Sequence, residues 1–211
     1  MKTTTHLSVA AVLTVLMQMG CQSPATDTRQ ILHLPELDQV RIEDAFWSPK
    51  LETWRKVTAN DVLDKFEGKY TPFPGWDDTR DAFRNFDRVA KGQRDIKQHD
   101  GPEWYDGLVY ESIRGIADFL AGHPNKEMEK RIDGYIDRIY AAQQTEPTGY
   151  INTHTQLMEN DHRWGDNGGL LRGQHDVYNA GMLIEAGVHY YQATGKTRLL
   201  EIATRFANYM A

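Results

Sequence analysis

The chain has 211 residues, of which 40% are hydrophobic and 26% charged, a balance that excludes a disordered or fibrous protein and allows one globular domain with a buried core. Its formal net charge is -6 at pH 7 and no run of lysine or arginine occurs, so neither nucleic acid nor an anionic membrane surface is an expected partner. An uncharged ligand such as a sugar is compatible with this charge.

The first residues resemble an export signal. After Lys2 comes the apolar run HLSVAAVLTVLMQM, which is too short to span a bilayer but has the length of the hydrophobic part of a secretory signal peptide. We expect residues 1–21 to be the signal and residues 22–36 a flexible linker. The protein is then exported, to the periplasm or cell envelope.

The only cysteine, Cys21, follows Gly20 in the sequence MGCQS, which resembles the processing site of a bacterial lipoprotein, where the cysteine is acylated. Gln18 stands where such sites usually have leucine. The alternative is a soluble secreted protein that loses Cys21 with its signal. A lipid on Cys21 is the only membrane attachment that we expect.

The part of the chain after the linker is predicted to be mainly helical. Apolar and charged residues alternate from Leu37 to Ile42, which predicts one short strand. Ser48 and Pro49 then form a typical helix start, with Ser48 as the N-cap. Apolar residues continue at helical spacing as far as Gly68, so the first helix is expected to end there.

Four further helices are indicated by apolar residues at helical spacing. Asp106 and Asn125 are the predicted N-caps of the first two. The third runs from Val177 to Thr194, and the fourth starts at Thr197 and continues to the last residue. Because neither glycine nor proline follows its apolar stripe, we expect the chain to be truncated inside this helix.

The helix from Val177 to Thr194 has apolar residues on two faces, including Ile184 on one and Met182 on the other. It is therefore expected to pack between two neighbours. Helices buried on both faces, alternating with one-sided partners, suit the inner ring of a toroid built from helix hairpins. The predicted fold is all-α, a partial (α/α)6 toroid with long loops over residues 37–211.

Two long segments, Tyr70 to Tyr105 and Thr145 to Gln174, are rich in glycine, aspartate and aromatic residues and are expected to be loops. Connections of this length commonly line a site. Tryptophan and tyrosine offer a flat apolar face beside a hydrogen-bonding group, which complements a sugar ring. The alternative is that these aromatic residues only attach the loops to the core.

Metal-binding and nucleophile motifs are missing from the sequence. His175 and Asp176 resemble the start of a zinc-protease helix, but Asn179 stands where the second histidine is required, so we expect no metal ion in this segment. Four carboxylates are candidates for glycoside hydrolysis: Asp106, Glu111, Asp176 and Glu185. For each of them the alternative is an N-cap or a structural pair.

Three stretches carry a resemblance to a known family: VRIEDAFWSPKLETWR, the stretch from Trp104 to Thr155, and HDVYNAGMLIEAGVHYYQATGKTRLLEIATRFANYM. They are similar to the N-terminal part of glycoside hydrolase family 127, the bacterial β-L-arabinofuranosidases. The resemblance covers most of the chain from Val40 onward and implies an (α/α)6 barrel and a carbohydrate substrate. Met182 stands where the family commonly has a second histidine, as in a divergent relative.

The catalytic groups of that family are a cysteine nucleophile held by zinc and a glutamate acid/base. The resemblance implies that they lie C-terminal to residue 211, so this segment alone is expected to be inactive and to bind no cofactor, although zinc is possible in a full-length relative. We expect a glycoside hydrolase that acts on L-arabinofuranose-containing glycans when full length. The alternative is a helical carbohydrate-binding or interaction protein without turnover.

The resemblance also implies the substrate contacts, because the histidine that matches His175 lines the sugar pocket of the family. Closing the glycine-rich loop onto the helix is the alternative role for His175. Asp176 is expected to cap the helix, while His175, Tyr178 and Asn179 face the cavity. The expected substrate-binding residues are His175, Asp176, Tyr178, Asn152, His154 and Trp164.

Overall fold

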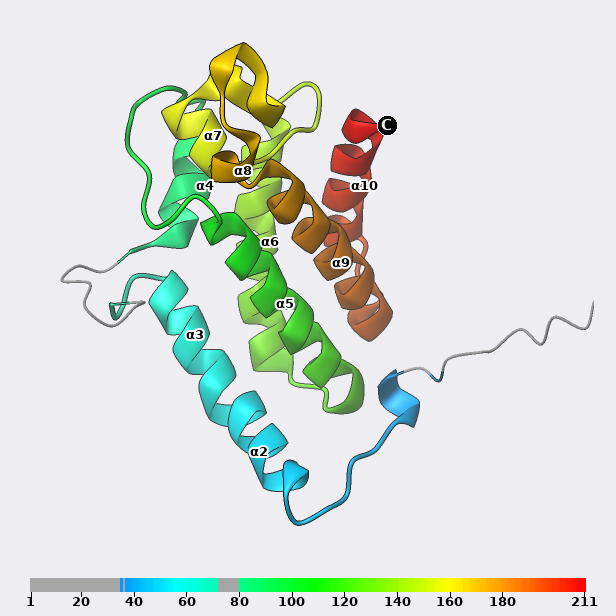
Figure 1. Cartoon of the computed structure of the whole chain (residues 1–211). Helices are drawn as coiled ribbons and strands as arrows, with labels where there is room; N and C mark the ends of the chain where they lie inside the picture. Colours follow the sequence, from blue (N-terminus) through cyan, green and yellow to red (C-terminus); the bar gives the residue numbers. More distant parts are fainter. Residues whose placement is uncertain (1–34, 36, 72–79) are drawn as a thin grey trace, which may run out of the picture. The chain divides into compact units, whose positions relative to one another are not determined.

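The computed structural model describes residues 35, 37–71 and 80–211 (Figure 1). The predicted signal with Cys21, and the predicted linker apart from residue 35, lie outside these residues. Residues Pro35–Ala211 form one unit. It is built almost entirely of helices, which confirms the all-α prediction.

The strand predicted from Leu37 to Ile42 is not formed. Leu37–Gln39 is a single 3-10 turn, η1, and the next three residues are irregular. A strand needs a neighbouring strand to satisfy its backbone groups. In the described part of the chain the one isolated bridge joins Glu67 to Asp81 instead. The alternating pattern was misleading because this stretch has no pairing partner.

The first predicted helix has three consecutive parts: α2 (Trp47–Thr53), a π-helical turn (Trp54–Thr58) and α3 (Ala59–Phe66). Its N-cap was predicted wrongly. Asp44, rather than Ser48, accepts hydrogen bonds from the first backbone N–H groups, those of Phe46 at 2.7 Å and of Trp47. Ser48 supports this cap, because its hydroxyl oxygen accepts a bond from the backbone N–H of Asp44 at 3.0 Å.

The longer helices that follow are α4 (Ala82–Ala90), α5 (Tyr105–Gly122), α6 (Lys126–Gln144), α9 (Asp176–Thr194) and α10 (Arg198–Met210). Asn125 caps α6 as predicted, with its side chain accepting from two backbone N–H groups. Gly195 ends α9 as predicted, with a φ of 73° that suits glycine.

Helices α5 and α9 lie side by side and run in the same direction (Figure 1). Gly107 contacts Asn179 at their N-terminal ends, and Asp118 contacts His189 further along both helices. Helix α6 packs between α4 and α10, and α10 also packs on α9. This pairing of two parallel helices with outer partners is the hairpin arrangement of a partial helical toroid.

The core lies between these helices and is dominated by large apolar and aromatic side chains. Phe83 of α4 stacks on Tyr135 of α6, with ring centroids 4.0 Å apart. Further fully buried members come from the five longer helices: Phe86, Tyr110, Ile113, Ile132, Ile139, Leu183, Tyr190 and Phe206. Burial of such side chains provides most of the free energy that holds the helices together.

The two segments predicted to be loops contain helices of their own. The first includes α4, whose N-cap Asp81 accepts from the backbone N–H of Arg84 at 3.0 Å. The second includes α7 (Thr153–Met158), η3 (Asn160–Gly168) and α8 (Leu171–Gln174). Glycine and aspartate suggested loops here, but short helices with capped ends use the same residues.

Helix α9 is not buried on both faces, in contrast to the prediction. Leu183 and Tyr190 on one side of the helix are fully buried. Val177 and Tyr191 on another side are 62% and 44% exposed. The face that carries Val177 and Tyr191 is therefore only partly buried in the described unit, although Ala180 on the same face is fully buried.

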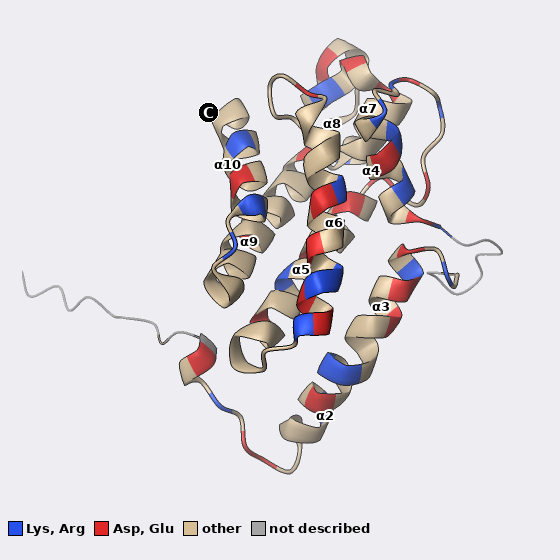
Figure 2. Ribbon diagram, turned by 180° about the vertical axis from the view of Figure 1, so that it is seen from behind, with Lys and Arg blue, Asp and Glu red and all other residues tan. Residues whose placement is uncertain are grey.

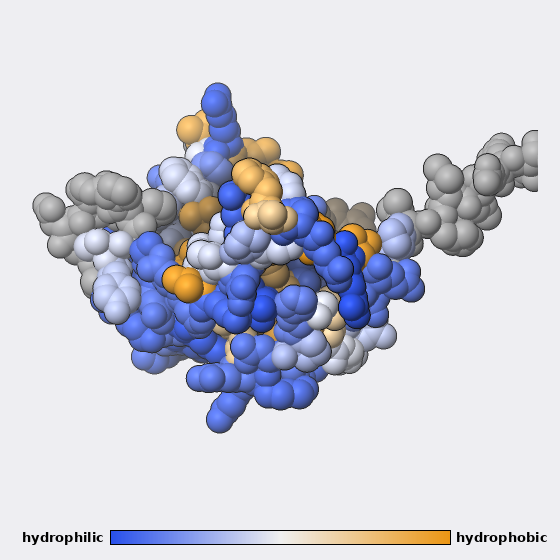
Figure 3. Space-filling view, turned by 90° about the horizontal axis from the view of Figure 1, so that it is seen from below, coloured by the Kyte–Doolittle hydropathy of each residue, from blue (hydrophilic) through white to orange (hydrophobic). Residues whose placement is uncertain are grey.

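Charged side chains cover much of the outer surface. Acidic and basic residues alternate along α6 (Figure 2), where Arg138 pairs with Asp87 of α4 at 2.6 Å. In the view from below, hydrophilic residues cover most of the face and apolar residues form separate patches (Figure 3). Among the described residues, no helix is both long and apolar enough to span a bilayer.

Candidate functional site

The N-terminal ends of α5 and α9 meet and hold the residues that the sequence indicated. The backbone N–H of Gly107 donates to Oδ1 of Asn179 at 3.0 Å. A Cβ atom on Gly107 would lie 2.3 Å from Cε1 of Tyr178, so only glycine allows this approach without displacing the tyrosine ring. Asn179 is buried in this contact and does not face a cavity, which corrects the prediction for that residue.

His175 lies at the start of α9 in the left-handed region, with φ 56° and ψ 25°. Its ring contacts Trp104, the residue immediately before α5, at a centroid distance of 5.1 Å and Tyr178 at 6.2 Å. The Nδ1–H group donates to the carbonyl oxygen of Gly173 at 2.9 Å. Because Nδ1 carries the proton, Nε2 of the neutral ring is an acceptor. The histidine therefore offers a lone pair to an incoming hydroxyl group.

His154 lies on α7 and faces this region. Burial lowers its pKa, and it interacts electrostatically with Glu103 and His175. Its ring contacts His99 edge to face at 5.2 Å. Within the described part of the chain, its Nδ1 atom is buried without a hydrogen-bond partner. His154 is thus a neutral imidazole with unused hydrogen-bonding capacity.

Asp176 is fully buried and makes all its hydrogen bonds inside the protein. Oδ1 accepts from the Tyr150 hydroxyl at 2.5 Å and from Nδ2 of Asn152 at 2.8 Å, and Oδ2 accepts from the backbone N–H of Trp164 at 3.0 Å. Asp176 makes no side-chain cap bond to α9. The predicted capping role is therefore wrong, and the carboxylate joins three separate segments.

Asn152 is fully buried, and Trp164 of η3 is partly buried. Asn152 caps α7 and donates to the carbonyl oxygen of Gln174 at 2.9 Å. Trp164, with φ 58°, packs among aromatic rings on the α10 side, including Tyr150 and Phe206, each at 6.0 Å. Of the six predicted substrate contacts, His175, Tyr178 and His154 lie at the helix ends, while Asp176, Asn152 and Trp164 support them from inside.

Asp106 occupies the first turn of α5, where it is 2% exposed. It does not cap the helix, because its carboxylate accepts from the Thr153 backbone N–H at 2.7 Å and from the Thr153 hydroxyl at 2.6 Å. Burial raises the pKa of Asp106 to about 6, although both bonds from Thr153 act in the opposite direction.

The remaining two carboxylates considered for catalysis are paired. Glu111 accepts a hydrogen bond from the Tyr178 hydroxyl, which raises the pKa of that tyrosine after the larger effect of burial. Glu185 pairs with Arg114 across α5 and α9 at 2.5 Å, and both side chains are largely exposed. This confirms that carboxylates within these helices have structural partners.

Sequence reasoning missed Trp104 as a member of the site. It is 38% exposed and immediately precedes α5, next to the ring of His175. An exposed tryptophan at a helix start, two residues before a buried aspartate, was the available signal. The pairing with His175 could not be found without knowing that α5 and α9 are adjacent and parallel.

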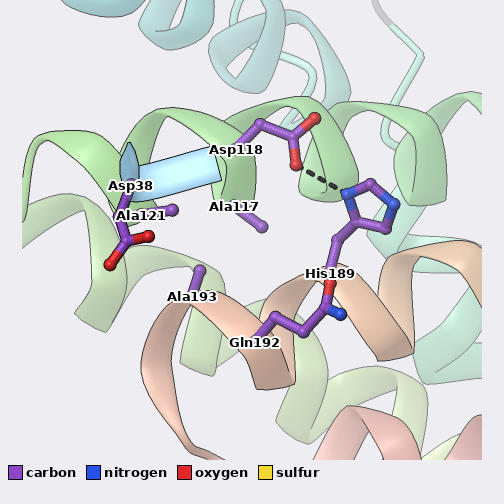
Figure 4. Close-up of a pocket in the computed structure, with 7 residues that line it drawn as sticks. All are labelled: Asp38, Ala117, Asp118, Ala121, His189, Gln192 and Ala193. Atoms are coloured by element: carbon purple, nitrogen blue, oxygen red, sulfur yellow. Dashed lines mark hydrogen bonds and ion pairs between the residues drawn. The ribbon is translucent and has the colours of Figure 1, made fainter. Parts of the chain in front are cut away.

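A separate pocket of about 390 Å³ lies further along α5 and α9, toward their C-terminal ends (Figure 4). Its walls include Ala117, Asp118, His189 and Gln192, together with Asp38 of η1. Asp118 and His189 point toward one another, and Nδ1 of His189 lies 2.6 Å from Oδ1 of Asp118. The imidazole of His189 and the carboxylate of Asp118 in this pocket therefore hydrogen-bond to each other.

The described residues do not fit the zinc centre that the family resemblance implies for full-length relatives. No three histidine, cysteine, aspartate or glutamate side chains converge anywhere in residues 37–71 and 80–211. Cys21 lies outside the described chain. We therefore derive no chemical step through a metal ion from these residues.

Comparisons with known proteins agree with the fold. The family model described as β-L-arabinofuranosidase, GH127 catalytic domain, matches residues 39–211. A non-reducing end β-L-arabinofuranosidase of Bifidobacterium longum subsp. longum is 35% identical over 123 residues, which are 57% of this chain and 18% of that protein.

Two solved structures are also similar. A GH127 β-L-arabinofuranosidase from Geobacillus stearothermophilus T6 has a TM-score of 0.68 at 32% identity and covers 81% of this chain. A second GH127 β-arabinofuranosidase has a TM-score of 0.68 at 30% identity and covers 82%. The chain spans only 25% and 26% of these two proteins. Because the family match extends over most of the chain, the protein belongs to the GH127 β-L-arabinofuranosidase catalytic-domain family of glycoside hydrolases.

Proposed function

We propose that this protein takes part in the hydrolysis of β-L-arabinofuranosides and that the described residues supply part of the sugar-binding surface. The observation that carries the proposal is the contact between His175 and Trp104 where the N-terminal ends of α5 and α9 meet. Family membership supports a carbohydrate substrate.

The chemistry of these side chains suits an uncharged sugar. Nε2 of His175 can accept a hydrogen bond from a sugar hydroxyl, and the exposed face of Trp104 can pack against the apolar C–H groups of the ring. Tyr178 and His154 extend the same surface. A neutral acceptor beside an aromatic face distinguishes this site from one that binds an anion.

Bond cleavage needs groups that the described residues do not bring together. Asp106 and Asp176 are buried, and their carboxylate oxygens accept hydrogen bonds from inside the protein. Neither carboxylate can therefore contact a glycosidic oxygen in this conformation. We therefore assign these residues to binding and support, and place the acid/base and nucleophile outside the described surface. Zinc chemistry would likewise require ligands other than these.

The test is sugar affinity of the protein with His175→Ala. Loss of one hydrogen bond to a sugar hydroxyl costs about 1 to 3 kcal/mol, so the dissociation constant for methyl β-L-arabinofuranoside should rise roughly tenfold to hundredfold. His189→Ala on the same helix, more than three turns away, is the matched control and should leave affinity unchanged. Calorimetric titration measures both.

Because His175 has a positive φ, alanine strains the backbone there as well. His175→Asn separates the two effects, since asparagine tolerates this conformation better but places its polar atoms differently. Weak binding by both variants supports the proposal. Wild-type affinity in both, with an early melting transition for the alanine variant alone, would show that His175 is a structural residue.

A sugar-binding protein without turnover is the second candidate, favoured by the sealed state of Asp106 and Asp176. Release of free arabinose from a β-L-arabinofuranoside by the purified protein distinguishes the two functions. We also propose export through the signal at residues 1–21, with a lipid on Cys21, on the basis of the sequence pattern alone.

A further inference from the structure

A short segment, Tyr150–Thr153, runs between the N-terminal ends of α5 and α9 and is bound to both. On the α9 side, Asp176 accepts hydrogen bonds from Tyr150 and Asn152. On the α5 side, Asp106 accepts two bonds from Thr153. Each parallel helix thus contributes one buried aspartate from its first turn, and both aspartates hold the same segment.

Among the described residues, neither aspartate has a positively charged partner. Asp106 and Asp176 are 2% and 0% exposed, and no lysine or arginine in the described chain forms an ion pair with either. A buried carboxylate without a counter-ion depends on its hydrogen-bond donors, and each donor must keep its position. Asp176 uses three donors, from Tyr150, Asn152 and Trp164, so the two segments that carry them become fixed relative to α9.

Both histidines of the site are next in sequence to residues that make these hydrogen bonds. His154 follows Thr153, whose backbone N–H and hydroxyl bind Asp106. His175 precedes Asp176 and has a left-handed backbone conformation that is uncommon for a non-glycine residue. Asp176 also accepts a hydrogen bond from the backbone N–H of Trp164, which fixes the loop that precedes His175 in the sequence.

We propose that Asp106 and Asp176 are positioning residues that fix the Tyr150–Thr153 segment, so that His154 and His175 present their imidazole rings to the same sugar. The role in sugar binding rests on the function proposed above. The role in fixing the rings does not, because it concerns hydrogen bonds within the protein.

The test compares Asp176→Asn with Glu185→Gln. Both variants remove one negative charge from α9, but Glu185 is exposed and, among the described residues, its carboxylate binds only Arg114. The asparagine keeps one acceptor for Tyr150 and Asn152 and turns its NH2 group toward the Trp164 N–H, which then has no acceptor. We expect the ¹⁵N and ¹H signals of the His175 ring to move or broaden in Asp176→Asn and to stay unchanged in Glu185→Gln.

Sugar affinity is measured on the same samples, at a temperature where circular dichroism shows each variant to be folded. Methyl β-L-arabinofuranoside should bind roughly tenfold more weakly to Asp176→Asn than to the control. Tyr150→Phe removes a single donor while keeping the ring, so it should shift the same histidine signals by a smaller amount. It also serves as the readout if the asparagine variant does not fold.

Wild-type histidine spectra in a folded Asp176→Asn protein would overturn the positioning role. If Asp176→Asn does not fold, wild-type spectra in Tyr150→Phe would overturn it equally. Absence of sugar binding in the wild type would count against the proposed function instead, and the histidine signals would still decide whether the aspartates position the rings.

Discussion

Replacing Asp106 with asparagine tests how the protein holds an ionised carboxylate in its interior. The side chain is almost fully buried, and its only described partners are the backbone N–H and hydroxyl of Thr153. Burial raises the pKa of Asp106 from 3.8 to about 6. Asparagine has nearly the same volume and cannot ionise, so the variant removes the charge while keeping the packing.

The expected effect follows from the difference between the folded and unfolded pKa values. Because the folded value is the higher one, the stabilising contribution is complete below pH 3.8 and disappears as the pH rises through about 6. A difference of about two pH units corresponds to roughly 3 kcal/mol. The stability of Asp106→Asn relative to the wild type should therefore increase by about 2 to 2.5 kcal/mol between pH 4 and pH 7, mostly below pH 6.5.

Urea unfolding followed by circular dichroism at several pH values measures this difference. Comparing the two proteins removes the contributions of the other titrating groups, several of which have lowered pKa values and act in the opposite direction. Thr153→Val removes a donor that lowers the pKa of Asp106, so its transition should move to higher pH. A difference between Asp106→Asn and wild type that stays constant from pH 4 to 7 would refute the reasoning.

Three further predictions concern other parts of the chain. Gly107→Ala should lower the free energy of unfolding by about 1 to 3 kcal/mol through overpacking, whereas Gly115→Ala, with open space around it on the same helix, should raise it by about 0.5 to 1 kcal/mol. Asp118→Asn weakens a partly exposed pair with His189 and should change that free energy by less than about 1 kcal/mol, measured by urea unfolding. Cys21→Ser should abolish metabolic labelling with a palmitate analogue; unchanged labelling would exclude the lipid anchor.

The helices that could be predicted from the sequence are those with a clear apolar period and a distinct end. Asn125 and Gly195 mark ends of α6 and α9 because their local conformations need only local bonds. Asp44 and Ser48 show the limit of this reasoning, since two polar residues near one helix start can both serve as caps. Which of the two caps the helix depends on the backbone conformation of the residues that precede it.

The candidate site was predictable only in part. The prediction of His175 and Tyr178 as sugar contacts rests on their place at the polar start of an apolar helix and on the family resemblance, and the structure places their rings near each other. Asp176 lies at the start of α9 as predicted, but it binds other segments and does not cap its own helix. Its partners Tyr150 and Trp164 are distant in sequence, so these contacts could not be predicted. An aspartate in a first turn looks the same whether it caps its own helix or binds another segment.

The parallel course of α5 and α9 gives the site an electrostatic character of its own. Aligned peptide dipoles place about half a positive charge at each helix N-terminus, and here the two ends lie together, so their potentials add. That potential lowers the cost of burying the two carboxylates, Asp106 and Asp176, in the first turns of these helices. A lysine or arginine placed at position 175 would face the same potential and be repelled, even where its side chain fits.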